Sequence, residues 1–241
     1  GVQKRHFLVE ASGNLTLANL TLTKGFASDF GGAVWNLGSL AVSGCTFTGN
    51  HAGAEGGAIQ SWGDSTSLFI QNSTFTGNSS AGIASAIDAG SVSMTLRHLT
   101  IRGNTATNAF GALVLWKNQA TLVNSLVAGN SDDSLGLVNG GTFAAASVNN
   151  LIGTGGAGGL VNGVNGNLVG VPANRLYLGA LANNGGPTPT LAPLPGSPVM
   201  NAGTIVAGLT TDQRGLARAA GTAPDIGAVE DSAGKIGRAH V

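Results

Sequence analysis

A short phrase that ends in Gly-Asn recurs four times in this chain at nearly constant spacing. It reads CTFTGN at 45–50 and STFTGN at 73–78, and it returns in weaker form as LTIRGN at 99–104 and SLVAGN at 125–130. The offsets between these copies are 28, 26 and 26 residues, and an earlier copy at 15–25 precedes the first by 25. Periods of roughly 20 to 50 residues are typical of solenoids and other repeat arrays.

Apolar residues fall into columns when the five copies are aligned, and within each copy they stand two residues apart. This alternation is typical of β-strands and does not fit the period of a helix. Copies of similar length with matching apolar columns are expected to stack strand upon strand. The sequence therefore predicts an all-β parallel β-helix of about five to seven coils with an irregular C-terminal cap, whose repeats occupy residues 1–152. Disorder is the disfavoured alternative, because a disordered chain would not keep these columns in register.

An asparagine ends each copy of the phrase, at the point where one apolar strand gives way to the next. Side-chain amides that stack at such a bend can hydrogen-bond from coil to coil. The glycine before each asparagine tolerates the backbone angles of a sharp corner. The sequence therefore predicts a structural ladder formed by Asn50, Asn78, Asn104 and Asn130.

Charge is sparse and balanced in this chain. Only 9% of the 241 residues are charged, with 11 basic and 11 acidic side chains. Binding to nucleic acid requires a basic surface, and insertion into a membrane requires a long apolar segment. The chain has neither feature, so neither nucleic-acid binding nor membrane insertion is expected. The composition, rich in glycine, asparagine, serine and threonine, suits an exported bacterial surface protein. We interpret the chain as a fragment whose N-terminal export signal is missing.

Two stretches resemble known bacterial families. The pairing of GGA(V/I) with FxxN, at 31–34 with 47–50 and at 56–59 with 75–78, resembles the polymorphic outer-membrane-protein repeat. Roughly residues 149–230, which include NNLIG, LANNGGPTPTLAPLPGSPVMNAG and TTDQRGLARAAGTAPDIGAVE, are similar to the C-terminal part of the choice-of-anchor Q family of β-helix proteins. These resemblances imply a right-handed coil in an exported, cell-surface or secreted protein whose anchor lies outside this fragment.

Residues 153–231 are predicted to contain the terminal coil or coils and a capping module. Five prolines between positions 187 and 198 forbid regular strands and suggest an extended strap across the last coil, which would otherwise expose a sheet edge. We interpret the charged residues of this region as ion pairs that hold the cap, with a ligand or metal role as the alternative. They are Asp212, Arg214, Arg218, Asp225 and Glu230.

Catalysis is the main alternative function, because pectate-lyase-like and polygalacturonase-like enzymes share the coil architecture. Such enzymes need at least two acidic groups that converge in one groove. The weak catalytic candidates are Asp132, Asp133 and Arg97, whereas Asp88 is interpreted as a single residue in a linker. The four histidines lack metal-binding spacing, and no helix-like segment follows the G-x-G-x-x-G match at 153–158, so neither a metal nor another cofactor is expected.

Three tryptophans, Trp35, Trp62 and Trp116, are weak candidates for a binding surface. They stand near the ends of strands, where their rings can stack on sugars, and packing beneath a loop is the alternative. The favoured function is a non-enzymatic stalk, adhesin or carbohydrate-binding surface with a polysaccharide or a host or cell-surface glycan as its partner. A polysaccharide lyase or glycoside hydrolase is the alternative.

The last residues, 232–241, are expected to lie outside the fold. KIGRAHV at 235–241 is the translation of a nucleotide string that resembles a common sequencing adapter. We therefore interpret this tail as a cloning or assembly scar that contributes to no site.

Overall fold

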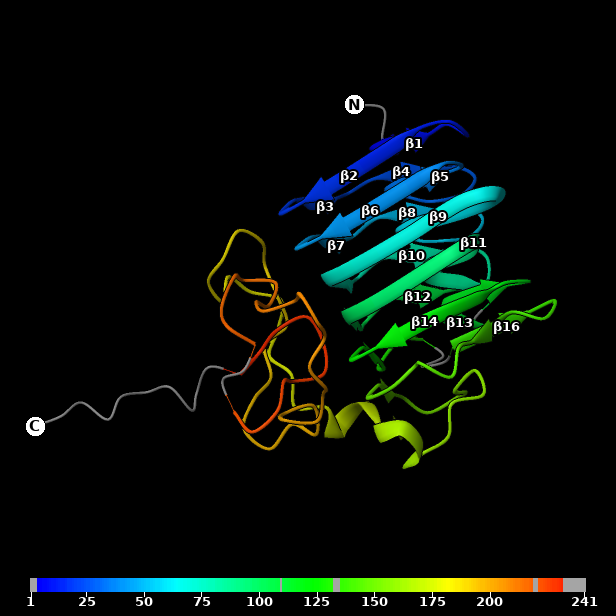
Figure 1. Cartoon of the computed structure of the whole chain (residues 1–241). Coiled ribbons are helices and arrows are strands. Elements are labelled where there is room, and N and C mark those ends of the chain that lie inside the picture. The colour runs from blue at the N-terminus through cyan, green and yellow to red at the C-terminus, as the bar shows by residue number, and fades with distance from the viewer. Residues whose placement is uncertain (1–3, 109, 132–134, 219–220, 232–241) are drawn as a thin grey trace, which may run out of the picture.

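The strands of this chain wind into a solenoid of stacked coils, and every pair of named strands is parallel (Figure 1). The computed structural model describes residues 4–108, 110–131, 135–218 and 221–231. The all-β parallel β-helix predicted from the repeat is confirmed. The tail at 232–241 lies outside the described residues.

Each coil contributes several short strands. The first two coils contain β1 (Phe7–Val9), β2 (Asn14–Ala18), β3 (Thr21–Thr23), β4 (Phe26–Ala27), β5 (Val34–Asn36), β6 (Ser39–Ser43), β7 (Thr46–Thr48) and β8 (His51–Ala52). The next two coils contain β9 (Ile59–Thr76), β10 (Ser79–Ser80), β11 (Ala84–Ile101) and β12 (Thr105–Ala106). Below them follow β13 (Gly111–Trp116), β14 (Gln119–Val123), β15 (Leu126–Val127), β16 (Leu135–Val138), β17 (Thr142–Phe143), β18 (Leu151–Ile152), the short 3-10 helix η1 (Val164–Gly166), β19 (Leu168–Val169) and the 3-10 helix η2 (Ala173–Arg175).

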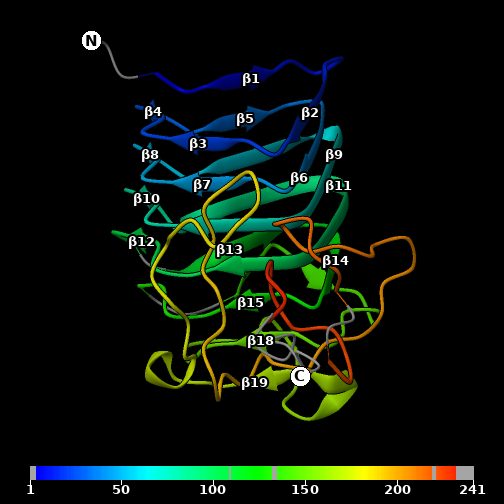
Figure 2. The same ribbon diagram turned by 90° about the vertical axis from the view of Figure 1, so that its left-hand side faces the viewer.

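Most of these strands form three walls, to which the long strands β9 and β11 contribute along their whole length (Figure 2). The short strands β4, β8, β10 and β12 form a separate four-stranded parallel sheet. The first wall runs β1, β5, β9, β11, β13, β16, and the second runs β2, β6, β9, β11, β14, β17. The third wall runs β3, β7, β9, β11, β15, β18, β19. Strand pairing therefore begins at Phe7 and reaches Val169, beyond residue 152.

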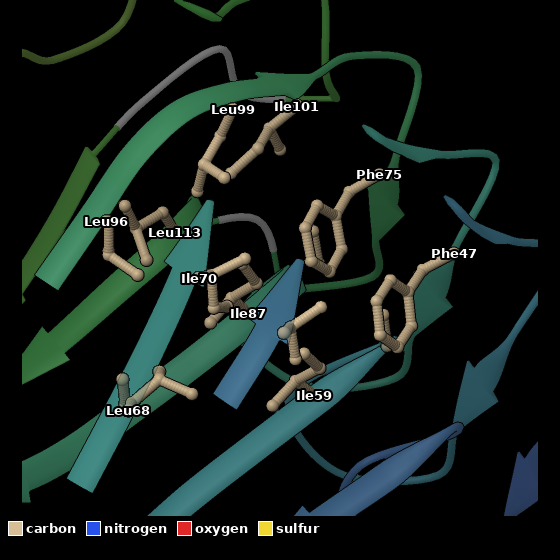
Figure 3. Close-up of a cluster of buried hydrophobic side chains, with 14 of the residues drawn as sticks. Phe47, Ile59, Leu68, Ile70, Phe75, Ile87, Leu96, Leu99, Ile101 and Leu113 are labelled. Atoms are coloured by element: carbon tan, nitrogen blue, oxygen red, sulfur yellow. The ribbon is translucent and has the colours of Figure 1, made fainter. Parts of the chain in front are cut away.

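Apolar side chains of the three walls point into one continuous core. In β6, Leu40 and Val42 are buried while the other three residues are partly exposed, as the two-residue alternation predicts. Phe47 and Phe75 are register partners on the third wall, and their rings stack at 4.6 Å between centroids with an interplanar angle of 3°. Figure 3 shows these rings beside the aliphatic core residues. Matching columns thus place like side chains directly over one another.

The four asparagines that end the repeated phrase form one hydrogen-bonded line. The side-chain Nδ2 of Asn50 donates to Oδ1 of Asn78 at 2.8 Å, and that of Asn78 donates to Asn104 at 2.9 Å. Asn104 donates in the same way to Asn130 at 2.9 Å. The Asn78 amide also donates to the backbone carbonyl of Phe47 at 3.0 Å, and its Oδ1 accepts the backbone N–H of Asn50 at 3.2 Å. The ladder therefore satisfies backbone groups that the corner would otherwise leave unpaired.

The C-terminal segment, residues 176–231, lies along the side of the solenoid (Figures 1 and 2, yellow to red). Thr188 Oγ1 donates to the carbonyl of Gly44 in the second coil at 3.0 Å, and Asn124 Nδ2 in the fifth coil donates to the carbonyl of Thr204 at 2.7 Å. The expectation of a strap across the last coil is therefore wrong. The segment follows a line of polar corner residues, which offers hydrogen-bond partners on many coils.

That line is a second corner column, between the second and third walls. Its residues have left-handed backbone angles, with φ from 46° to 67°: Asn19, Gly44, Asn72, His98, Asn124 and Asn149. Asparagine and glycine adopt this conformation more readily than most residues. His98 is buried between Asn124 Nδ2, 2.9 Å from its Nε2, and the carbonyl of Gly227, 3.3 Å from its Nδ1. Burial, with the Arg218 charge nearby, lowers the pKa of His98 to about 2, so the ring is neutral.

Five charged residues of the C-terminal segment are buried together: Asp212, Arg214, Arg218, Asp225 and Glu230. Arg214 pairs with Asp212 at 2.8 Å, and Arg218 lies 3.9 Å from Glu230. Arg218 Nη2 also donates to the side-chain oxygen of Asn72 at 2.8 Å, on the second corner column. These contacts tie the segment to the solenoid. Burial raises the pKa of Asp225 within the same cluster.

Candidate functional site

Three tryptophans converge in a groove on the outer face of the first wall. Trp35 comes from β5, Trp62 from β9 and Trp116 from the end of β13, and all three are partly exposed. The groove has a volume of about 370 Å³. We call it the tryptophan groove and define it by its lining residues: Phe30, Trp35, Leu37, Glu55, Gln60, Trp62 and Trp116.

The parallel register assembles this groove from residues that are far apart in the sequence. Trp35 pairs with Gln60, Gln60 pairs with Asp88, and Asp88 pairs with Val114. These four residues therefore form one column on the first wall. Residues that are register partners on neighbouring parallel strands project their side chains from the same face of the sheet. The column thus brings a tryptophan, an amide and a carboxyl group together.

Two of the indoles pack against each other over a glycine. The rings of Trp62 and Trp116 lie 5.4 Å apart at 76°, an edge-to-face arrangement. Gly90 is the register partner of Trp62, and a Cβ atom at position 90 would lie only 2.8 Å from the Trp62 ring. The missing side chain therefore gives the Trp62 ring the space that it occupies. Aromatic pairs in this geometry hold each other in place.

Asp88 anchors the groove from behind. Its residue surface is 0% exposed, and its two carboxyl oxygens accept hydrogen bonds from Trp116 Nε1 and Gln60 Nε2, each at 2.7 Å. Asp88 lies within β11, so the interpretation of a single residue in a linker is wrong. Burial, together with the nearby Glu55 carboxylate, raises the pKa of this carboxyl group to about 7.

Gln60 carries an unsatisfied acceptor. Its surface is 3% exposed, and its Nε2 is committed to Asp88, so that Oε1 faces away from that bond. Among the described residues Oε1 has no hydrogen-bond partner. A buried acceptor without a donor costs about 1–3 kcal/mol. A ligand hydroxyl or N–H group in the groove would remove this cost.

Of the catalytic candidates from the sequence, Arg97 does not line this groove. Arg97 lies on the second wall, where its Nε donates to Gln71 Oε1 at 3.0 Å and its guanidinium carbon lies 4.9 Å from the centre of the Phe69 ring. Asp132 and Asp133 lie outside the described residues. The two acidic groups that do come together, Glu55 and Asp88, were not identified as a pair from the sequence.

Burial decides what this acidic pair can do. A general acid or base must come within hydrogen-bonding distance of the reacting oxygen. Asp88 is fully buried and both of its oxygens are engaged, so it acts as a positioning residue for Trp116 and Gln60. Within the described part of the chain, Glu55 is the one acidic residue that lines the groove.

Two other features are absent from the described residues. These residues contain no group of three or more histidine, cysteine, aspartate or glutamate residues placed to hold a metal ion. No helix in the same part of the chain is long and apolar enough to cross a membrane.

The raised pKa of Asp88 predicts a pH-dependent stability. The carboxyl group titrates at about 7 in the folded chain and at about 3.9 in an unfolded chain, so the folded state binds the proton more tightly. Its contribution to stability is complete below about pH 4 and is lost as the pH rises through 7. Relative to Asp88→Asn, the wild type should lose about 2 kcal/mol of unfolding free energy between about pH 5 and pH 8. Urea denaturation at several pH values measures this difference, and a pH-independent difference would contradict the assignment.

Comparison with known proteins places the solenoid in a family. A family model for the right-handed β-helix region matches residues 3–169. Comparisons with curated proteins and with solved structures give no significant match. The family match covers more than half of the chain and includes every strand of the three walls. The chain therefore belongs to the right-handed β-helix family.

Proposed function

We propose that this chain is a non-enzymatic, carbohydrate-binding module of an exported or cell-surface bacterial β-helix protein, and that the tryptophan groove binds the sugar. The observation that carries the proposal is the convergence of three partly exposed indoles around one cavity of about 370 Å³. Small-molecule sites are apolar, aromatic-lined concavities of roughly 300–1,000 Å³ with a few placed polar groups. The face of an indole ring fits the C–H face of a sugar, and Gln60 Oε1 offers an acceptor to a hydroxyl group.

Location and partner belong to the same proposal. The low charge and the resemblance of residues 149–230 to the choice-of-anchor Q module support export and surface display. The repeats that resemble polymorphic outer-membrane-protein repeats support it as well. A polysaccharide or a host or cell-surface glycan is the partner that suits such a location.

Substitution of a groove tryptophan tests the proposal. Trp62→Ala removes a ring that lines the groove and packs against Trp116, and we expect it to weaken glycan binding at least about tenfold. Binding is measured by affinity electrophoresis against pectin, alginate, chitosan and cellulose, followed by calorimetry with the best ligand. Tyr177→Ala is the matched control, because Tyr177 is an aromatic residue that is 51% exposed outside the groove. Equal binding by the Trp62 variant and the wild type would overturn the proposal.

The same panel tests catalysis. The pairing of Glu55 with Asp88 is the observation that favours a glycoside hydrolase as the second candidate function. If the wild type releases reducing ends and Glu55→Gln abolishes that release, the chain is a glycoside hydrolase and the proposal of a non-enzymatic binding module is wrong.

A further inference from the structure

Two of the polar side chains that line the tryptophan groove carry hydrogen-bond acceptors. Glu55 contributes a carboxylate and Gln60 contributes the unpaired Oε1. One N–H of the Gln60 amide is donated to the Asp88 carboxyl group, which fixes the amide with Oε1 directed away from Asp88. A ligand that satisfies these groups must bring donors.

The charged side chain that lines the groove is acidic. Among its described lining residues Glu55 is the only charged one, and Asp88 lies directly behind it. Two basic groups lie beside its indole rings, outside the lining. Arg5 is paired with Asp29, and Lys117 is exposed to solvent. A carboxylate beside an apolar wall favours a cation and disfavours an acidic sugar.

The indoles of the groove already interact with cations. The guanidinium carbon of Arg5 lies 5.1 Å from the centre of the Trp35 ring, and Lys117 Nζ lies 5.7 Å from that of Trp62. Neither residue lines the cavity itself. Aromatic walls combined with a carboxylate recognise organic cations in many proteins, because the ring faces carry partial negative charge.

We propose that the sugar bound in the tryptophan groove carries a protonated amine, as in chains of glucosamine. The ammonium group donates to the Glu55 carboxylate and to Gln60 Oε1, while the sugar ring packs on the indoles. This inference rests on the proposed function and adds the chemical class of the ligand. It predicts that an acetylated amine, which has lost its charge, binds less tightly, and that a uronic acid binds least.

Three oligosaccharides of equal length separate these classes. Calorimetry is performed on the full chain with the tetramers of glucosamine, N-acetylglucosamine and galacturonate at mildly acidic pH, where an amine is protonated. We expect the glucosamine tetramer to bind about tenfold more tightly than the N-acetylated tetramer, and the galacturonate tetramer to bind more weakly than both.

Two variants with the same change in net charge locate the effect. Glu55→Gln should lower the affinity for the glucosamine tetramer about tenfold and leave that for the N-acetylated tetramer unchanged. Glu10→Gln is the control, because Glu10 is an exposed residue of the first coil outside the groove. It should change neither affinity.

The outcomes distinguish a failure of the amine inference from a failure of the proposed carbohydrate-binding function. The amine inference is overturned if the N-acetylated or galacturonate tetramer binds as tightly as the glucosamine tetramer. It is also overturned if Glu55→Gln keeps the full preference. Binding of the N-acetylated tetramer that Trp62→Ala removes would still support the carbohydrate site. If no glycan in either panel binds, the proposed function itself fails.

Discussion

Replacing Asn78 by alanine is expected to cost about 4 kcal/mol of unfolding free energy, because the ladder loses an inner rung. The side chain and backbone N–H of Asn50 lose their shared acceptor, and the carbonyl of Phe47 and Oδ1 of Asn104 each lose a donor. These groups are buried where water does not replace the lost partners. Urea denaturation followed by circular dichroism measures the change.

Ser79→Ala provides the matched control for Asn78→Ala. Ser79 is the next residue along the chain, and its side chain makes one partly buried hydrogen bond, with His51 Nδ1 at 2.9 Å. We expect a loss below about 1 kcal/mol for this variant. Equal midpoints for the two variants would show that the ladder does not stabilise the solenoid.

Arg218→Met is expected to release the C-terminal segment from the solenoid at a cost of about 3–5 kcal/mol, because it leaves buried carboxylates without their counter-charge. Arg218 is 2% exposed and donates to Asn72 Oδ1 and to the carbonyls of Gly227 and Ala228. Burial lowers its pKa to about 10, and the neighbouring carboxylates oppose that shift, so the guanidinium remains charged at neutral pH.

Hydrogen exchange distinguishes this local release from global unfolding. In Arg218→Met, amides between residues 199 and 230 should exchange faster while those of β9 and β11 stay protected. Arg175→Met is the control, because Arg175 lies exposed in η2. Unchanged protection of the C-terminal segment would contradict the anchoring role of Arg218.

The solenoid could be predicted because its determinants are periodic. A stacked coil places like residues over like residues, so the columns that contain Phe47 and Phe75, or Asn50 and Asn78, are visible as a repeat in the sequence. The second corner column also repeats in the sequence, at the position one residue before Cys45 and its counterparts. Its mixture of asparagine, glycine and histidine hides a common backbone conformation.

The tryptophan groove was predicted only in part because it departs from the repeat. Trp35, Gln60 and Asp88 share a column but no chemistry, and their proximity follows only from the register. They occupy the position that directly follows the apolar column of Val34 and Ile59. A comparison of that position in every coil would have identified them. The path of the C-terminal segment could not be read, since it depends on contacts between residues more than 100 positions apart, such as the bond from Asn72 to Thr211 with a separation of 139.

The docked C-terminal segment has a consequence for how the whole molecule loses its structure. In a simple solenoid each coil contacts only its neighbours, so the ends can fray one coil at a time. Here Gln213 donates to the carbonyl of Cys45, 168 residues away, while Asn149 near the other end donates to Ala202. One segment therefore spans coils that do not touch each other and makes their unfolding cooperative. Such distant contacts also slow folding, because a long stretch of chain must be closed into a loop, at a cost in entropy, before the contacts form.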